Sequence, residues 1–215
     1  MTDLFIINFK AYRKGTGIHA KKLLKELEEI PSSNIIVCLN PADTHLANQT
    51  SITCYAQLTH RVEYGSNTGH IPTELVKDLG CEGVIINHSE NTLPAEEVDL
   101  LVRHATKQGL KSVVCVPTVR KAKKYSSFKP SYIAIEPPSL IGGDVSVSSS
   151  QPSLIKDAVN ATKNIPLLCG AGVKSAEDVR KAKELGSQGI LVASGVVKAE
   201  SPVRAAKNMI QGFSM

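Results

Sequence analysis

The amino-acid sequence predicts an α/β fold: one closed (β/α)8 barrel with shortened helices, formed by residues 1–215 as a single domain. Strand-like and helix-like segments alternate without interruption, no linker or change of composition divides the chain, and polar or glycine residues collect at the ends of the strand-like runs. This pattern is typical of a parallel barrel whose functional residues all lie on one face. An open doubly wound sheet is the alternative. That fold more often carries a glycine-rich fingerprint in its first βα turn, where this chain has Asn8-Phe9-Lys10.

Eight short runs have the apolar composition of strands and are bounded by polar, proline or glycine residues. They are residues 4–8, 34–39, 51–56, 83–87, 112–116, 132–136, 167–169 and 189–193.

Eight segments with helical periodicity follow these runs in turn. They are residues 18–29, 41–48, 72–78, 95–108, 119–125, 152–162, 175–185 and 202–210. Prolines mark three starts and Ser175 with Asp178 forms a capping pair, while glycines mark three ends: Gly80, Gly109 and Gly186. Because the chain is shorter than the ~250 residues typical of this fold, the second, third and fifth helices should be brief or irregular.

The composition is that of an ordinary soluble protein, with 42% hydrophobic and 21% charged residues. No apolar run approaches the ~20 residues of a membrane span, and the chain begins directly with a strand, without a leader. We therefore expect a cytoplasmic protein without a membrane partner. The five cysteines show no CxxC spacing, so buried free thiols are expected rather than disulfides or a metal site.

The net charge of +5 favours an anionic ligand and raises nucleic acid as an option. Aromatic residues make up only 4% of the chain, tryptophan is absent, and the densest basic stretch, residues 120–125, is interrupted by Ala122. Nucleic acid is therefore not expected as a partner.

Glu136 is the most informative residue, because it ends an apolar run and is followed at once by Pro137 and Pro138. The prolines stop the strand, so a carboxylate is held at its carboxyl end beside the apolar, glycine-containing segment 139–144. Such a carboxylate could be a general base in a site from which water can be excluded. A glutamate that simply ends a strand near water is the alternative.

Lys10 and His88 lie at two other strand ends. An ammonium group there can stabilise a phosphate or a developing enolate oxygen, and Asn8 could position the same oxygen. A neutral imidazole can donate to a carbonyl and move protons between adjacent oxygens. The other five histidines fall on predicted helices or in loops. Taken singly, each of these residues could equally be an ordinary surface or turn residue.

Two turns of small residues follow the last two predicted strands, Gly170-Ala171-Gly172 and Ala193-Ser194-Gly195. Small residues let backbone N–H groups approach an anion, and phosphate sites of this fold often lie there. Glycine also simply makes tight turns. Together, the strand ends supply a base, a cation, a proton shuttle and a phosphate cradle, a set that suits proton abstraction beside the carbonyl of a phosphorylated substrate.

A set of motifs runs in order from the first strand to the last: Asn8-Phe9-Lys10, Ala56-Gln57, residues 65–69 with Thr68, Asn87-His88-Ser89-Glu90, and residues 134–142, 170–173 and 191–198. In this set the chain resembles the triosephosphate isomerases, and specifically their compact archaeal-type branch. The resemblance implies a TIM barrel that interconverts dihydroxyacetone phosphate and D-glyceraldehyde 3-phosphate through an enediolate, without metal or organic cofactor, in glycolysis and gluconeogenesis.

The resemblance also assigns roles to residues. Glu136 would be the catalytic base, His88 the neutral electrophile, and Lys10 the catalytic cation. Substrate-binding positions would be Asn8, Phe9, Lys10, Ile141, Gly172, Ala193 and Ser194. Ser89 and Glu90 would support them.

The resemblance places Ile141 and Gly142 in a lid that closes over the substrate. The chain departs from the family where Asn91 and Thr92 replace a common arginine, and where the seventh loop, which includes residues 169–172, lacks the Tyr and Ser that latch this lid in many relatives. Two other functions stay open from the residues themselves. One is a non-catalytic barrel that senses a phosphorylated metabolite, and the other is a different phosphosugar isomerase or lyase.

The polar segment 64–70 is long for a βα connection. A solvated loop is one interpretation. The resemblance instead implies that this loop inserts into a neighbouring subunit, giving a homodimer or, by pairing of dimers, a homotetramer.

Overall fold

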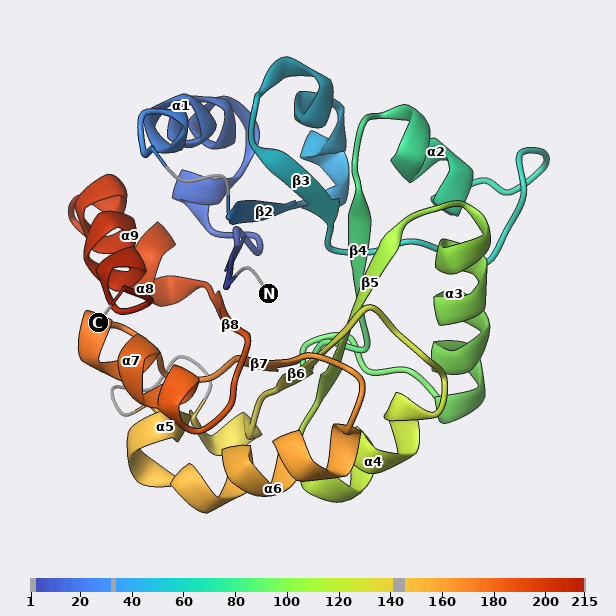
Figure 1. Ribbon diagram of the computed structural model, residues 1–215. Helices are drawn as coiled ribbons and strands as arrows, with labels where there is room; N and C mark the ends of the chain where they lie inside the picture. Colours follow the sequence, from blue (N-terminus) through green and yellow to red (C-terminus); the bar gives the residue numbers. More distant parts are fainter. Residues whose placement is uncertain (1–2, 32–33, 141–145, 215) are drawn as a thin grey trace.

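The computed structural model describes residues 3–31, 34–140 and 146–214. In these ranges eight parallel strands pair in sequence order, and β1 closes on β8, so the predicted barrel is confirmed (Figure 1). The strands are β1 Leu4–Asn8, β2 Ile35–Leu39, β3 Thr53–Ala56, β4 Gly83–Ile86, β5 Lys111–Val116, β6 Tyr132–Ile135, β7 Leu167–Cys169 and β8 Gly189–Val192.

The helices surround the barrel (Figure 1). Those at predicted positions are α1 Gly17–Glu28, α2 Thr73–Asp78, α3 Ala95–Lys107, α4 Val119–Ser126, α6 Pro152–Thr162, α7 Ala176–Glu184 and α9 Pro202–Gln211. The second predicted helix is a 3₁₀ helix, η2 Pro41–Gln49, and the third and fifth are short, as expected from the chain length. Ser175 and Asp178 form the predicted capping box of α7.

Four further short helices in the described ranges were not predicted: η1 Arg13–Gly15, η3 Pro138–Leu140, α5 Val147–Ser150 and α8 Ser194–Val197. All have three or four residues, too few to show hydrophobic periodicity, and they form because the chain must turn within a loop.

Two layers of apolar side chains form the core. The barrel interior is filled by alternate strand residues: Ile6, Ile36, Cys38, Tyr55, Ile85, Val113, Cys115, Ala134, Leu168 and Leu191. The intervening strand residues pack outward against the helices. Asn8 follows Ile6 by two positions and Glu136 follows Ala134 by two, so strand alternation directs both polar side chains inward above the core.

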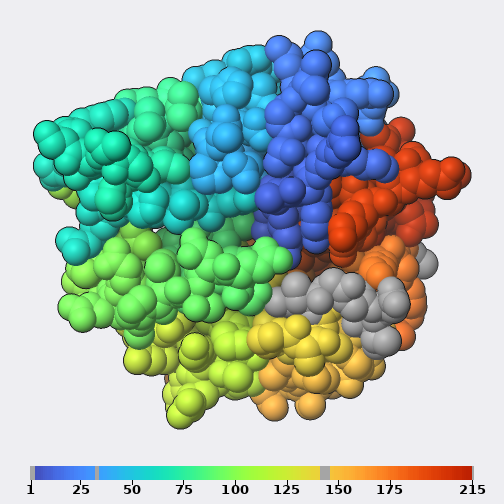
Figure 2. Space-filling view, turned by 180° about the vertical axis from the view of Figure 1, so that it is seen from behind, coloured from blue at the N-terminus to red at the C-terminus, as the bar shows by residue number. Residues whose placement is uncertain are grey.

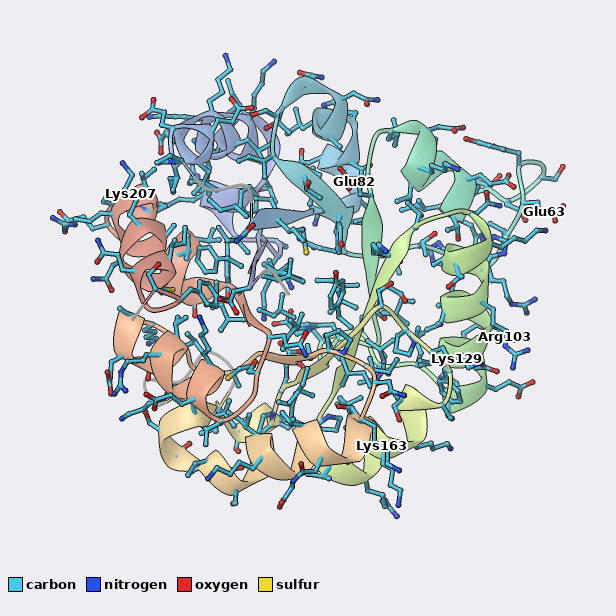
Figure 3. All side chains as sticks on the ribbon, viewed as in Figure 1. Glu63, Glu82, Arg103, Lys129, Lys163 and Lys207 are labelled. Carbon is cyan, nitrogen blue, oxygen red and sulfur yellow. The ribbon has the colours of Figure 1, made fainter. Side chains whose placement is uncertain are left out.

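The cysteines behave as predicted, since all five are buried free thiols. Most charged side chains lie on the outer surface, as Figure 3 shows for Arg103, Lys163 and Lys207, whereas Lys10 and Glu136 are buried. Seen from behind, the units follow one another in sequence order around a common centre (Figure 2). No helix in the described ranges is both long and apolar enough to cross a membrane.

Candidate active site

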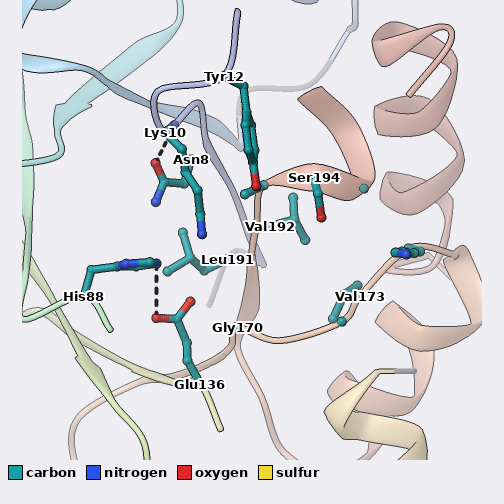
Figure 4. A pocket seen from close by; sticks show the side chains of 14 residues that line it. Asn8, Lys10, Tyr12, His88, Glu136, Gly170, Val173, Leu191, Val192 and Ser194 are labelled. Carbon is teal, nitrogen blue, oxygen red and sulfur yellow. Dashed lines mark hydrogen bonds and ion pairs between the residues drawn. The ribbon is translucent and has the colours of Figure 1, made fainter. Parts of the chain in front are cut away.

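The predicted residues meet at one end of the barrel, because parallel strands place all their carboxyl ends on the same face. A pocket there is lined by Asn8, Lys10, Tyr12, His88, Glu136, Gly170, Gly172, Val173, Lys174, Leu191, Val192, Ala193, Ser194 and Gly195. Figure 4 shows Lys10, His88 and Glu136 directed toward a common space between them.

Lys10 is held by its backbone and by its ammonium group. Its φ of 48° lies in the left-handed region, where a non-glycine residue costs of order 1–3 kcal/mol. Two side chains secure this conformation: Asn8 Oδ1 accepts from Lys10 N at 3.0 Å, and Gln57 Nε2 donates to Lys10 O at 3.2 Å. Lys10 Nζ donates to Glu90 Oε1 at 2.8 Å. The cation is therefore positioned before any ligand enters.

His88 is oriented as a neutral donor. The backbone N–H of Glu90 donates to His88 Nδ1 at 3.1 Å, so Nδ1 carries the lone pair and the ring proton belongs on Nε2, which faces the pocket. Burial, together with the charge of Lys10, lowers the pKa of His88 to about 4. The imidazole is consequently uncharged at neutral pH.

Asn87 shapes the turn that carries His88. Its φ is 61°, and its side chain donates to Cys115 O at 2.8 Å and accepts from Leu93 N at 2.9 Å. The amide thus joins the end of β4 to β5 and to the following loop, which fixes the direction in which His88 leaves the strand.

Glu136 is a buried carboxylate with an unsatisfied oxygen. The residue is 4% exposed, and its Oε2 has no hydrogen-bond partner within the part of the chain that the structure describes. Burial raises the pKa of Glu136 to about 7, although the Cys115 thiol and the Lys10 charge act in the opposite direction. Glu136 Oε2 lies 3.7 Å from His88 Nε2, and because the imidazole is neutral this contact is not an ion pair. The carboxylate is thus poised to accept a proton near neutral pH.

Gly170 makes room for this carboxylate. A Cβ atom at position 170 would lie 2.5 Å from Glu136 Cγ and 3.0 Å from Glu136 Oε1. Any larger residue would displace Glu136, so the base that follows β6 requires a glycine in the position that follows β7.

The opposite side of the pocket is built from small residues of the seventh and eighth loops. Gly172 has a φ of 69°, and Ala193 precedes the short helix α8. A Cβ atom at Gly195 would meet Val173 O at 2.9 Å, so the two loops pack closely only because this residue is glycine. Backbone amides of such turns can approach an anion closely.

The substrate-binding roles of Phe9 and Ile141 stay predictions. The Phe9 side chain is fully buried in the core between strands and helices and does not line the pocket, because it points to the opposite side of the backbone from Asn8 and Lys10. Ile141 lies outside the described residues.

Sequence reasoning missed Tyr12, Val173, Lys174, Leu191 and Val192 as pocket residues. In the sequence, Leu191 and Val192 resemble ordinary strand residues, and Tyr12 and Lys174 resemble loop residues. Val173, Leu191 and Val192 lie within the motif segments 170–173 and 191–198, and Tyr12 and Lys174 lie two residues from Lys10 and Gly172, so these motifs were the signal that could have identified them. In the described ranges, no group of three or more His, Cys, Asp or Glu side chains is arranged to hold a metal ion.

The chain matches known proteins over nearly its whole length. The family model for triosephosphate isomerase matches residues 3–210. The chain belongs to the triosephosphate isomerase family. The triosephosphate isomerase of Thermoplasma volcanium is 39% identical over 96% of this chain and 98% of its own. That of Saccharolobus solfataricus is 40% identical over 96% of this chain and 94% of its own.

The same fold occurs in a more distant crystal structure. The triosephosphate isomerase of Bartonella henselae superposes with a TM-score of 0.74 at 19% identity, covering 100% of this chain and 98% of that one. At this identity the likeness supports the fold alone.

Proposed function

We propose that this chain interconverts dihydroxyacetone phosphate and D-glyceraldehyde 3-phosphate, with Glu136, His88 and Lys10 as its catalytic residues. The observation that carries the proposal is the pairing of opposite pKa shifts in one pocket. Burial raises the pKa of the Glu136 carboxyl to about 7, while the adjacent imidazole of His88 stays neutral because its pKa falls to about 4. A glutamate base beside a neutral histidine is the well-known arrangement of triosephosphate isomerases, so this pairing follows an established pattern of the family.

The reaction moves a proton from one carbon of the substrate to Glu136 and then from Glu136 to the neighbouring carbon. Glu136 removes a proton from the carbon next to the carbonyl, and the electron pair moves to the carbonyl oxygen to give an enediolate. His88 Nε2–H donates to that oxygen and can pass a proton between the two oxygens. Lys10 balances the negative charge. Glu136 then returns its proton to the neighbouring carbon, which leaves the other triose phosphate.

The phosphate group of the substrate would occupy the side of the pocket opposite Glu136. Gly172, Ala193 and Ser194 line that side with small side chains, so their amides are available for close approach. Asn8 would contact the triose, since its Oδ1 accepts from Lys10 N and its amide group lies at the pocket wall.

The proposed assembly is a homodimer or homotetramer in which residues 64–70 enter a neighbouring subunit. This loop projects from the barrel beside α2 (Figure 1). Thr68 at its tip is exposed, and so is Tyr64, at 55%. Burial of such a loop against a second copy would remove this exposed surface from water.

We assign the activity to glycolysis and gluconeogenesis in the cytoplasm, where the five free thiols would remain reduced. No cofactor is assigned. The two other functions, a metabolite-sensing barrel and a different phosphosugar isomerase or lyase, predict no isomerisation of the triose phosphate.

The test is a coupled isomerase assay on D-glyceraldehyde 3-phosphate, with substrate–solvent deuterium exchange measured in parallel for the wild type and Glu136→Gln. We expect turnover and exchange in the wild type and a loss of most of both in the variant. A wild-type protein that binds the triose phosphate without converting it would favour the sensor. Near wild-type exchange in Glu136→Gln would remove Glu136 from the role of base.

A further inference from the structure

The seventh loop is tied to a second segment of the chain through one carboxylate, that of Asp178 on α7. Asp178 Oδ2 accepts from Lys174 N at 3.1 Å, from Ser175 N at 3.1 Å and from Ser175 Oγ at 2.8 Å. Its other oxygen, Oδ1, accepts from Ser146 Oγ at 2.5 Å. A capping residue needs only the bonds at Ser175, so the bonds to Lys174 and Ser146 go beyond helix capping.

Ser146 begins a segment that is attached to the seventh loop at further points. Val147 N donates to Ala171 O of this loop at 3.0 Å, and Ser148 Oγ donates to the backbone oxygen of Asp178 in α7 at 3.0 Å. Ser146 and Ser148 are themselves buried, at 2% and 3% exposure. The helix α5 and the seventh loop are therefore joined by buried polar groups that are satisfied by one another.

The residues immediately before this attachment form the phosphate side of the pocket. Gly172, Val173 and Lys174 line the pocket directly, and Lys174 also supplies one of the amides bound by Asp178. The left-handed φ of Gly172 reverses the chain, so the direction of its amide depends on where the following residues are fixed. A shift of Lys174 would therefore also shift Gly172, which lies only two residues earlier in the chain.

Partial burial raises the pKa of the Asp178 carboxyl, but hydrogen bonds from Ser146 and Ser175 outweigh it and leave the pKa below its ordinary value. Asp178 is thus ionised at neutral pH, and charge-assisted bonds of this kind are stronger and more directional than neutral ones.

We propose that Asp178 is a positioning residue that fixes the turn Gly172–Lys174, and through it the recognition of the substrate's phosphate, while taking no part in the proton transfer. This inference rests on the proposed function. It predicts a loss confined to substrates that carry a phosphate, because Asp178 holds the far end of the seventh loop, at Lys174 and Ser175, whereas Glu136 lies beside Gly170 at the start of that loop. His88 follows β4, on another part of the barrel.

The experiment compares kcat/KM for D-glyceraldehyde 3-phosphate with kcat/KM for D-glyceraldehyde, which lacks the phosphate. Asp178→Ala should lower the first value roughly 10- to 100-fold, the range expected when a distant change misplaces a binding group by up to about 1 Å. The second value should change less than about threefold. The inhibition constant of inorganic phosphate should rise in the same variant.

Two further variants separate positioning from capping. Ser175→Ala removes the helix cap but leaves the Lys174 amide bonded to Asp178, so it should lower the melting temperature and keep the ratio of the two kcat/KM values. Asp178→Asn keeps an acceptor oxygen for the amides and should show the same selective loss at smaller size, about threefold or more. The Asn variant decides the question if Asp178→Ala does not fold.

Equal losses on both substrates in Asp178→Ala, or a selective loss of the same size in Ser175→Ala, would overturn the inference and leave the proposed function intact. A wild-type protein inactive on D-glyceraldehyde 3-phosphate would instead overturn the proposed function and the inference with it.

Discussion

Replacing Gly170 by alanine tests the placement of the base without touching the base itself. The added Cβ would lie 2.5 Å from Glu136 Cγ, whereas ordinary van der Waals contact begins at about 3.4 Å. The backbone at Gly170 is not in the left-handed region, so alanine meets no strain of its own. The contact is relieved when Glu136 moves, and the required movement is about 0.9 Å.

A displacement of about 1 Å in a catalytic group costs on the order of 100-fold in rate. Gly170→Ala should therefore lower kcat/KM about 100-fold, which is about 2.7 kcal/mol in the activation free energy. Competitive inhibition by inorganic phosphate should change little, because Gly172 and Ser194 lie on the other side of the pocket.

The assay is steady-state isomerisation of D-glyceraldehyde 3-phosphate, corrected for the folded fraction by circular dichroism. Gly83→Ala is the matched control. Its Cβ would crowd Lys111 O at 2.7 Å and Tyr55 at the amino end of β4, on the face opposite the pocket. The control should lower the melting temperature and keep kcat/KM per folded molecule. Gly170→Ala with activity within threefold of the wild type would refute the reasoning.

Four other outcomes follow from the site and the surface. Burial raises the pKa of Glu136 from 4.5 to about 7, so the native state loses stability as the pH rises from 4.5 to 7. Glu136→Gln should therefore be about 3 kcal/mol more stable to unfolding than the wild type at pH 8 and show no such gain at pH 4. Urea titrations at the two pH values measure this difference. Wild-type kcat/KM should fall as pH drops through about 7, and a profile flat to pH 5 would contradict the buried base. Burial and the charge of Lys10 lower the pKa of His88 to about 4, so its imidazole should remain neutral in a ¹⁵N NMR titration down to about pH 5. The contribution of His88 to the stability of the native state should be lost as the pH falls from 6.5 toward 4, because only the unfolded chain takes up that proton. An imidazolium signal at pH 7 would exclude the assigned role. Thr68→Arg should dissociate the proposed oligomer and reduce activity, as sedimentation velocity over a range of concentrations checks; a wild type that is monomeric and fully active throughout would exclude the assembly.

Local rules explain why the sequence predicted so much of the barrel. Continuous apolar runs ended by proline, glycine or asparagine define strands and their carboxyl ends, and these signals act within a few residues of one another. The predicted strand at residues 132–136 and the observed β6 differ only at Glu136, where the ladder ends because Pro137 has no N–H to continue it. Since parallel closure brings all carboxyl ends to one face, the meeting of Lys10, His88 and Glu136 was predictable from their positions alone.

Tertiary structure decided how these residues behave. The raised pKa of Glu136 and the lowered pKa of His88 arise from burial among strands distant in sequence, and part of the shift at His88 comes from the charge of Lys10 at the end of another strand. The left-handed conformation of Lys10 is likewise held in part by Gln57, which follows β3 and donates to Lys10 O. Propensity within the chain cannot specify such contacts, because their energies come from groups that only the closed barrel brings together.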